Sequence, residues 1–399
     1  MTDLSDLTVR MPYAYYNTMR KTFKYRLYPT KQQQRLLDQQ LEECRWLYNR
    51  LLAERKQAWE ERQEAVRLYD QQATLPALKA ERLPLAGVHS QVLQNVAVRL
   101  DLAFQAFFRR VKTGETPGYP RFRGKGRYDS ITFPQVPVGC RLQAEDQCVR
   151  VANVGLVKII LHRPAEGTPK TATVSRSSTG KWYVSLSCEC AEPAPLPATG
   201  QQIGIDVGLK TFATLSDGQE IANPRFFREE EKALARAQRR LSKEEKGTLE
   251  RACRRRVVAR MHERTRWRRG DFAHQHSRRI VNKFDVIAVE DLSVNRMVHI
   301  HCLAKSIHDV AWSQFAALLS YKAAWASRRF IAVNPAYTSQ DCSQCGHRKT
   351  DHSLADRTYA CLCCGVALDR DLNASLNILG VGLHTLGLAP RSSRIYLGE

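Results

Sequence analysis

Two pairs of cysteines near the C-terminus restrict the possible folds of this 399-residue chain more than any other feature. Each pair has the spacing Cys-x-x-Cys, and 15 residues separate the inner cysteines of the two pairs. Two turns of this kind each present two thiolates, and four thiolates complete the tetrahedral shell of a structural Zn²⁺ site. A glycine directly follows each pair, where a tight turn needs a positive φ. We therefore predict a zinc site with four ligands: Cys342, Cys345, Cys361 and Cys364.

Cys363 is a further cysteine in this segment, and its spacing does not form a Cys-x-x-Cys pair with Cys361. A closed site with four thiolates has no open coordination position, so we expect the zinc to be structural rather than catalytic. A redox-active Cys-x-x-Cys motif is the alternative interpretation. The presence of two pairs at zinc-ribbon spacing argues against it.

The chain shows neither a secretory signal peptide nor a membrane-spanning segment. Met1 is followed by acidic and polar residues, and no run of about 18 apolar residues occurs. We therefore expect a cytoplasmic protein with no membrane partner. The 12 cysteines of such a chain indicate metal ligands or free thiols rather than a disulfide scaffold.

Strand and helix patterns alternate in the second half of the chain. A Pro/Ala-rich linker at 193–200 marks a domain boundary. Beyond it, five segments are expected to be strands: 203–207, 211–215, a short one near Glu220, 286–289 and 330–333. Long basic helices fill 224–283, and further helices are expected over 306–326 and from about Asp371. This alternation predicts an α/β domain.

The first half of the chain has strand patterns at both ends and helices between them. Alternating residues predict a strand over 22–28, which Pro29 and Thr30 end. Apolar residues at helical spacing predict one helix from there to about Leu68 and a second from near Ser90. Four later segments are expected to be strands: 130–133, 155–161, 171–177 and 182–188. Together these strands predict a small β-barrel or sandwich with the helices inserted.

These patterns give the expected domain organisation. The multidomain α/β chain has seven parts in order: a disordered leader (1–19), a β-barrel domain (20–29 plus 129–192), a helical domain inserted in it (30–128), a linker (193–200), an α/β domain (201–336 plus 366–388), a cysteine module inserted in that domain (337–365) and a C-terminal tail (389–399). We find no internal repeat.

The chain carries 62 Lys and Arg against 40 Asp and Glu, a net charge of +22. Such a surplus favours a polyanionic partner, because basic side chains on phosphates release counterions; a surplus that only aids solubility is the alternative. Residues 225–285 hold 20 basic against 9 acidic residues, so half of the net charge lies in this region. We predict nucleic-acid contacts from six of its arginines: Arg239, Arg240, Arg254, Arg255, Arg264 and Arg268.

A loop at 118–128 mixes aromatic with basic residues. Aromatic faces stack on bases while basic groups hold phosphates, so the loop is a candidate for binding nucleic acid. A basic surface loop without that role explains the composition equally well. The candidate contacts are Tyr119, Arg121, Arg123 and Lys125.

Three carboxylates stand at the ends of predicted strands or at the start of a predicted helix: Asp206, Glu290 and Asp371. Carboxylates at strand ends of an α/β sheet project into the crevice there. Three that converge are able to hold two divalent metals about 4 Å apart, which activate water and stabilise the leaving oxygen of a phosphodiester. Oxygen ligands suit Mg²⁺ or Mn²⁺.

Other functions share parts of this pattern. A Gly-x-Asp-x-Gly after a strand also occurs in sugar kinases and actin-like ATPases, but we find no second Asp-Gly phosphate loop and no glycine-rich adenosine motif. His299 and His301 have the His-x-His spacing of tyrosine transposases, which join strands, but no tyrosine lies close in the sequence. Loss of one acid would mark a nucleic-acid-binding protein without cleavage, and all three acids are present.

Taken in order, these motifs resemble those of the TnpB family, the OrfB-type proteins of bacterial and archaeal insertion sequences. The resemblance covers roughly residues 19–380, and six segments carry it: 23–30, 118–123, 204–210, 289–292, 337–340 and 369–374. The leader before Met19 and residues 391–399 have no counterpart in the family pattern.

The resemblance implies an RNA-guided DNA endonuclease with an RNase H-like (RuvC) catalytic domain, related to type V CRISPR effectors. It assigns catalysis to Asp206, Glu290 and Asp371. The implied partners are a guide RNA from the element's end and double-stranded target DNA that carries a short adjacent motif; a monomer in a bacterial or archaeal cell is expected. The early strands and helices would form wedge and recognition domains. The alternatives are a guided DNA-binding repressor without cleavage and a transposase accessory protein.

Overall fold

The computed structural model describes residues 18–292, 311–349 and 357–388 of the chain. It divides into two compact units, Met1–Glu192 and Pro193–Glu399, which we call unit 1 and unit 2. Most of the predicted leader, the predicted tail and the pair His299 and His301 lie outside the described residues.

Unit 1 is built on a seven-stranded antiparallel sheet that is nearly closed and barrel-like. Its strand order is β2-β6-β7-β1-β5-β4-β3, so the first strand of the chain lies in the middle of the sheet. The strands are β1 (Thr18–Tyr28), β2 (Ser130–Phe133), β3 (Cys140–Gln143), β4 (Cys148–Val151), β5 (Gly155–Ile160), β6 (Thr168–Arg176) and β7 (Trp182–Ala191). In β1 the alternate residues Phe23, Tyr25 and Leu27 are buried, which is the alternation that the sequence indicated.

The helices of unit 1 are inserted between β1 and β2. They are α1 (Lys31–Arg62), α2 (Leu68–Ala73), α3 (Leu75–Glu81), α4 (Leu83–Ala86) and α5 (Ser90–Lys112). Thr30 caps α1, because its hydroxyl accepts from the Gln33 amide and the Gln33 side chain accepts from the Thr30 amide. The long helices α1 and α5 pack on each other through one apolar core.

Two predictions for unit 1 need correction. The first helix ends at Arg62 and not near Leu68, because Gln63 adopts a left-handed conformation with φ of 54° and its amide donates back to the last turn. The first strand begins at Thr18, which pairs with Ala191 of β7. It starts four residues before the predicted strand over 22–28 and two residues before the predicted start of the β-barrel domain at residue 20.

Unit 2 is built on a five-stranded mixed sheet in the order β10-β9-β8-β11-β12. The strands are β8 (Gln202–Val207), β9 (Thr211–Leu215), β10 (Glu220–Ala222), β11 (Val286–Glu290) and β12 (Arg329–Val333). The three strands β8, β11 and β12 run parallel, and β9 and β10 extend the sheet in antiparallel fashion. This confirms the mixed α/β class that the alternating pattern predicted.

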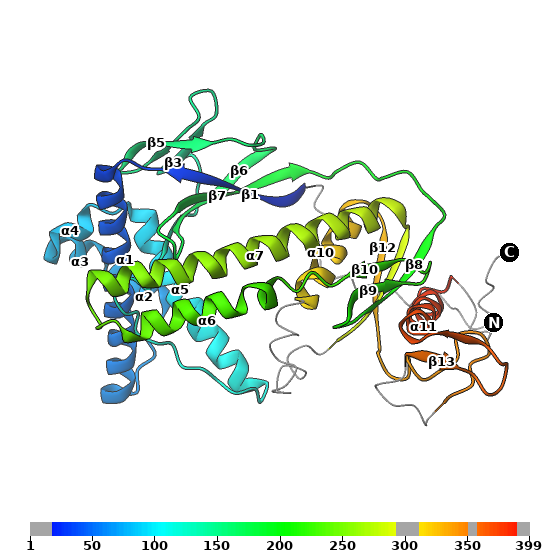
Figure 1. The fold of residues 1–399 in the computed structure, drawn as a ribbon. Coiled ribbons are helices and arrows are strands. Elements are labelled where there is room, and N and C mark those ends of the chain that lie inside the picture. The colour runs from blue at the N-terminus through cyan, green and yellow to red at the C-terminus, as the bar shows by residue number, and fades with distance from the viewer. Residues whose placement is uncertain (1–17, 293–310, 350–356, 389–399) are drawn as a thin grey trace. The chain divides into compact units, whose positions relative to one another are not determined.

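Helices cover both faces of this sheet (Figure 1). On one face, α7 (Leu249–Lys283) and α10 (Trp312–Trp325) enclose an apolar core with Ile203, Ile205, Ile287 and Val289. These strand positions alternate with Gly204 and Ala288, which therefore belong to the other face. That other face is covered by α11 (Arg370–Thr385), whose Ile378 packs against Ala288.

Two further parts complete unit 2. The basic helix α6 (Phe226–Lys243) packs along α7, and the two form the long antiparallel pair drawn in green and yellow-green in Figure 1. The cysteine module holds two short strands, β13 (Thr358–Ala360) and β14 (Ala367–Asp369), and leads directly into α11. Within the described part of the chain, no helix is long and apolar enough to cross a membrane.

Candidate active site and metal centre

The register of two parallel strands brings Asp206 and Glu290 together. Ile205 of β8 pairs with Val289 of β11, and the next residue on each strand is the acid. Both carboxylates therefore end neighbouring parallel strands, on the face of the sheet that α11 covers. The prediction that these strand ends would carry the acids into one region agrees with this register.

Close packing of α11 on β8 places Asp371 at the same edge. A Cβ atom on Gly204 would lie only 2.0 Å from the Ser375 carbonyl oxygen, so the helix backbone touches the strand at this point. Asp371 precedes Ser375 by one helical turn, and Asp206 follows Gly204 by two residues along β8. The Asp369 side chain caps the helix by accepting from the Asp371 amide at 2.8 Å, which fixes the first turn.

The pKa of Asp206 reflects the presence of the other two acids in the same region. Burial raises it most, and the charges of Glu290 and Asp371 raise it further, to about 8. The pKa of Glu290 is also raised by burial, while a hydrogen bond from the Thr338 hydroxyl lowers it. A buried carboxyl group whose pKa is raised by nearby acids is typical of functional sites, and the Arg370 charge offsets only part of this rise.

The carboxylates do not form a tight cluster by themselves. Among the described residues, the four paired cysteines are the group of potential metal ligands whose donor atoms all lie within 4.8 Å of one another. The acids interact electrostatically over longer distances.

The contact at Gly204 leads to a stability prediction. Gly204→Ala is expected to destabilise unit 2 by about 2 kcal/mol, because the added methyl group overlaps the backbone of α11 and must displace the helix. Gly270→Ala is the matched control: a Cβ there meets no atom closer than 4.0 Å, and alanine favours the interior of α7 by up to about 1 kcal/mol. Urea unfolding of both variants measures the difference in their free energies of unfolding. A Gly204→Ala variant as stable as the wild type would contradict the close packing of α11 on β8.

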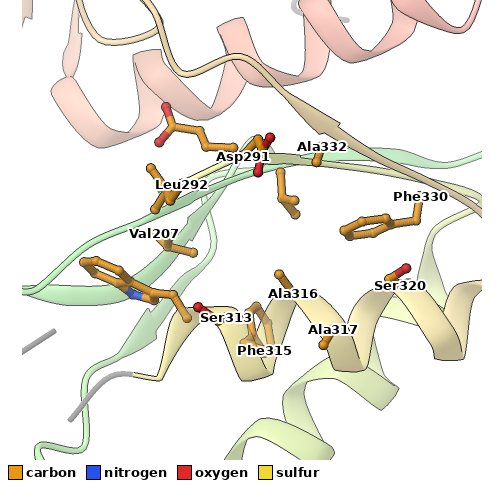
Figure 2. Close-up of a pocket in the computed structure, with 13 residues that line it drawn as sticks. Val207, Asp291, Leu292, Ser313, Phe315, Ala316, Ala317, Ser320, Phe330 and Ala332 are labelled. Atoms are coloured by element: carbon orange, nitrogen blue, oxygen red, sulfur yellow. The ribbon is translucent and has the colours of Figure 1, made fainter. Parts of the chain in front are cut away.

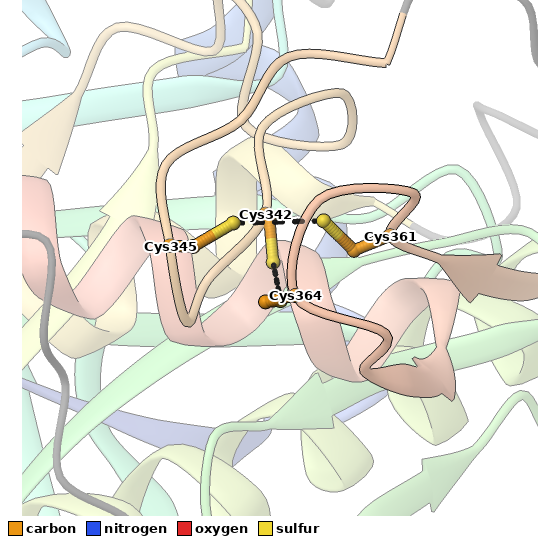
Figure 3. A group of neighbouring side chains, drawn as sticks. All are labelled: Cys342, Cys345, Cys361 and Cys364. Carbon is orange, nitrogen blue, oxygen red and sulfur yellow. Dashed lines mark hydrogen bonds between the residues drawn. The ribbon is translucent and has the colours of Figure 1, made fainter.

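The four paired cysteines face one another across two turns (Figure 3). The Sγ atoms of Cys342 and Cys364 lie 3.6 Å apart, and those of Cys345 and Cys361 lie 3.5 Å apart. Zinc–sulfur bonds of about 2.3 Å in a tetrahedron place sulfurs about 3.8 Å apart, so the four thiols fit Zn²⁺. Gly346 and Gly365 have φ values of 76° and 75°, as predicted for the turns after each pair.

The thiols of this module differ in acidity. Hydrogen bonds from the backbone N–H groups of Cys364 and Cys363 lower the pKa of the Cys361 thiol to about 6, which favours its thiolate form. Burial raises the pKa of Cys342. Cys363 is exposed and stands outside the group of four, as its spacing indicated.

The loop at 118–128 is anchored on the helices of unit 1. The Tyr119 ring makes edge contacts with Phe104 and Phe107 at centroid distances of 5.5 and 5.4 Å, and 45% of the residue is exposed. The Arg123 guanidinium lies 5.3 Å from the centre of the Tyr48 ring. Arg121 and Lys125 are exposed. Tyr119 and Arg123 therefore have structural contacts in addition to any contact with nucleic acid.

The six candidate arginines of α6 and α7 fall into two groups, those that form an ion pair within the described part of the chain and those that do not. Arg268 pairs with Glu229 at 2.9 Å, Arg264 with Glu230 at 3.6 Å and Arg254 with Glu244 at 3.5 Å. The other three candidates, Arg239, Arg240 and Arg255, are exposed, and no ion pair of theirs occurs among the described residues. The second group offers the cationic surface that is more readily available to phosphates.

A pocket of about 310 Å³ adjoins the acidic centre on the α10 side of the sheet. Figure 2 shows Ala316, Ala317 and Ser320 of α10 facing Val207 and Ala332 of the strands across it. Glu290 also lines it, so the pocket and the acidic centre share one side chain. This pocket could not be predicted from the sequence, because small residues on α10 leave the space and the spacing of apolar residues does not reveal it.

Sequence reasoning also missed three polar residues that support the acids. They are Thr338, which donates to Glu290, and two asparagines on α11, Asn373 and Asn377, which bind the backbone of the cysteine module around its first cysteine. The spacing of the asparagines, one helical turn apart, is the signal that could have identified them.

Three protein-family models match parts of the chain. A family described as "Probable transposase" (OrfB of IS605) matches residues 185–301, and a family described as "Cas12f1-like, TNB domain" matches residues 312–378. A family described as "Helix-turn-helix domain" matches residues 19–64, although these residues form β1 and the single long helix α1 here.

Several known proteins are similar to this chain. A protein of Streptomyces pristinaespiralis described as "Putative RNA-guided DNA endonuclease" is 36% identical, over 92% of this chain and 90% of its own length. The InsQ protein of Escherichia coli (strain K12), which carries the same description, is 30% identical over 91% of this chain and 92% of its own length. The solved structure described as "Cryo-EM structure of the Cas12f1-sgRNA-target DNA complex" covers 91% of this chain and 99% of its own, with a TM-score of 0.57 and 15% identity.

Fold and site together define the class: a mixed α/β protein with a Cas12f1-like fold, acids at the ends of its parallel strands and a four-cysteine module. The relatives that are at least 30% identical over nine tenths of the chain then fix the family. The chain belongs to the TnpB (OrfB) family.

Proposed function

We propose that this protein is an RNA-guided DNA endonuclease encoded by a transposable element, with an RNase H-like (RuvC) catalytic centre formed by Asp206, Glu290 and Asp371. The observation that carries the proposal is the convergence of three acids from distant segments, reflected in the raised pKa of Asp206. The descriptions of the two relatives that span nine tenths of the chain support RNA guidance and DNA as the substrate.

Mg²⁺ or Mn²⁺ fits the oxygen donors of this centre. Burial and the neighbouring acids raise the pKa of Asp206, and a divalent cation would stabilise the charged form of its carboxyl group. When bound, a pair of such cations provides an activated water and stabilises the leaving oxygen of a phosphodiester. The three acids would hold the cations, and the strands and the first turn of α11 fix the positions of the acids.

The four-cysteine module fits Zn²⁺ in the same way that structural zinc sites do. We assign it a structural role, since four thiolates leave no coordination position for water or substrate. The module also lies directly before α11, the helix that carries Asp371. A bound zinc would thus stabilise the approach to the acidic centre without taking part in the chemistry.

We propose that nucleic acid is held by basic surfaces on both units. In unit 2 the exposed Arg239, Arg240 and Arg255 are the first candidates, and in unit 1 Arg121 and Lys125. The partners would be a guide RNA from the end of the element and a double-stranded target DNA. The solved Cas12f1 structure is a complex of that protein with an sgRNA and target DNA, which supports this choice.

We also propose functional names for the parts of the chain. Residues 20–29 with 129–192 would be the wedge domain and 30–128 the recognition domain. Residues 201–336 with 366–388 would be the RuvC domain, and 337–365 the zinc ribbon. The order of the elements supports these names, since the helices interrupt the unit 1 sheet and the cysteine module interrupts unit 2 between β12 and α11.

The proposed function predicts cleavage that depends on a guide. Protein co-expressed with the DNA that flanks its gene is expected to copurify with an RNA. With Mg²⁺, this complex should cut a supercoiled plasmid that carries a sequence matching the RNA beside a randomised adjacent motif. Sequencing of the RNA and of the cut ends is the measurement, and a plasmid without the matching sequence is the control. Specific binding of the target without cutting in Mg²⁺ or Mn²⁺ would instead identify a guided DNA-binding protein.

A further inference from the structure

The segment between β12 and the first cysteine pair contacts the acidic centre through Thr338. The Thr338 hydroxyl donates to the Glu290 Oε1 atom at 2.6 Å, and the Pro335 carbonyl oxygen at 3.1 Å is the alternative acceptor for the same hydrogen. Only 5% of Thr338 is exposed. A buried hydrogen bond to a carboxylate is among the stronger ones in proteins, so this contact restricts the rotation of the Glu290 side chain.

The backbone of the same segment is held by α11, which carries Asp371. The Asn377 side-chain amide donates to the carbonyl oxygens of Thr338 at 2.8 Å and Asp341 at 2.7 Å. One turn earlier on α11, Asn373 donates to the Asp341 carbonyl at 2.9 Å and accepts from the Ser343 amide at 2.9 Å. The two asparagines thus bind the chain on both sides of Cys342.

These contacts form a continuous connection between two of the three acids. Glu290 at the end of β11 is bonded to Thr338, and Thr338 is bonded to Asn377 on the helix that begins with Asp371. Glu290 has three side-chain torsions, so without a partner its carboxylate samples several orientations. A carboxylate with one oxygen held by a hydroxyl keeps its second oxygen available as a ligand.

We propose that Thr338 is a positioning residue for divalent-cation binding: its hydroxyl orients Glu290, and Asn377 sets its position relative to Asp371. This inference rests on the proposed function, since it assigns a cation to the acidic centre. Partners that orient metal ligands typically change metal affinity by about 10- to 100-fold when they are removed. In this role Thr338 acts through Glu290 and does not itself contact the reacting phosphate.

The test compares Mn²⁺ binding by Thr338→Val and Thr338→Ser, measured by electron paramagnetic resonance on the full chain. Valine keeps the shape of threonine and removes the donor, and serine keeps the donor. We expect valine to weaken Mn²⁺ binding by about 10-fold or more and serine to stay within about 3-fold of the wild type. Thr385→Val is the matched control, because its hydroxyl bonds the Val381 carbonyl on the exposed last turn of α11.

Asn377→Ala provides a second variant in case the valine protein folds poorly. It leaves the hydroxyl of Thr338 in place but removes the side-chain bond to its carbonyl oxygen, so we expect an intermediate loss of Mn²⁺ affinity. Wild-type affinity in both Thr338→Val and Asn377→Ala would overturn the inference. Equal weakening by valine and serine would do the same, because keeping the hydroxyl donor would then make no difference to Mn²⁺ binding.

Cleavage assays on the same proteins separate this inference from the proposed function. If both hold, the Mg²⁺ concentration for half-maximal cutting rises in Thr338→Val, while the rate at saturating Mg²⁺ changes much less. If Mn²⁺ binds in a Thr338-dependent way but the wild type cuts no DNA with its RNA, the positioning role stands and the nuclease proposal fails. A wild-type chain without an Mn²⁺ site at these acids would overturn both.

Discussion

Replacing Asp206 with asparagine is expected to abolish DNA cleavage and, without added divalent cations, to stabilise the protein at pH 8. The loss of cutting should reach about 10³-fold or more, because a metal ligand contributes several kcal/mol to the transition state. The gain in stability follows from the charge of Asp206. Its carboxylate is mostly buried and is affected by the charges of Glu290 and Asp371, and asparagine occupies nearly the same volume without the charge.

The effect of pH on this stability difference has a definite sign. The pKa of Asp206 is raised from 3.8 in its ordinary environment to about 8 in the folded protein. Between these values the folded state binds more protons than the unfolded state, so the stability of the wild type falls as the pH rises through this range. In the asparagine variant, residue 206 does not titrate and so adds no pH dependence to the stability. Its advantage should therefore be absent near pH 4 and largest at and above pH 8.

The expected difference in stability between the asparagine variant and the wild type follows from the shift in the pKa of Asp206. One pKa unit corresponds to about 1.4 kcal/mol. Because Asp206 is partly exposed, we expect on the order of 3 kcal/mol at pH 8 rather than the full value of the shift. Thermal unfolding from pH 4 to 8.5 measures it, with Glu220→Gln on the exposed strand β10 as the matched control. A stability difference that does not vary with pH, or a variant that still cuts, would remove Asp206 from the centre.

Loss of one of the four paired cysteines is expected to release zinc and to unfold the module. Cys361→Ser replaces the thiolate with the lowered pKa, and three remaining thiols hold Zn²⁺ far less tightly. Structural zinc sites contribute on the order of 10 kcal/mol in isolated zinc-binding peptides, so a module with one short two-stranded sheet should not persist without the metal. Cutting should fall as well, because α11 begins directly after β14.

Cys363→Ser is the matched control for this prediction. It changes a cysteine in the same turn that is exposed and stands outside the group of four. Elemental analysis should find one zinc per chain in the wild type and in Cys363→Ser, and almost none in Cys361→Ser. Limited proteolysis should cut the Cys361→Ser module first. Zinc retained by Cys361→Ser, or lost from Cys363→Ser, would contradict the assignment of the ligands.

The sequence predicted the parts of the site that depend on local patterns. Apolar runs ending in an acid marked the strands that carry Asp206 and Glu290, and two short spacings marked the cysteines. These signals are strong because each depends on residues only a few positions apart. The pairing of β8 with β11 in the register that aligns the two acids follows once both strands belong to one parallel sheet.

Features that depend on packing between distant segments escaped prediction. Asp371 was predicted to join the other two acids, but the close contact of α11 with Gly204 was not, since a lone glycine in a strand pattern does not specify its partner. The Thr338 bond to Glu290 joins residues 48 positions apart. The strands β3 and β4 were not predicted, and the predicted helix over 63–68 is interrupted by a left-handed residue, Gln63.

The direct junction between the cysteine module and α11 affects how this part of the chain could change during evolution. Asp369 is both the last residue of β14 and the cap of α11, so no linker separates the two elements. An insertion there would rotate Asp371 by about 100° per added residue relative to the module. Relatives should therefore vary in length within the turn between α6 and α7, and hardly at all between residues 367 and 371.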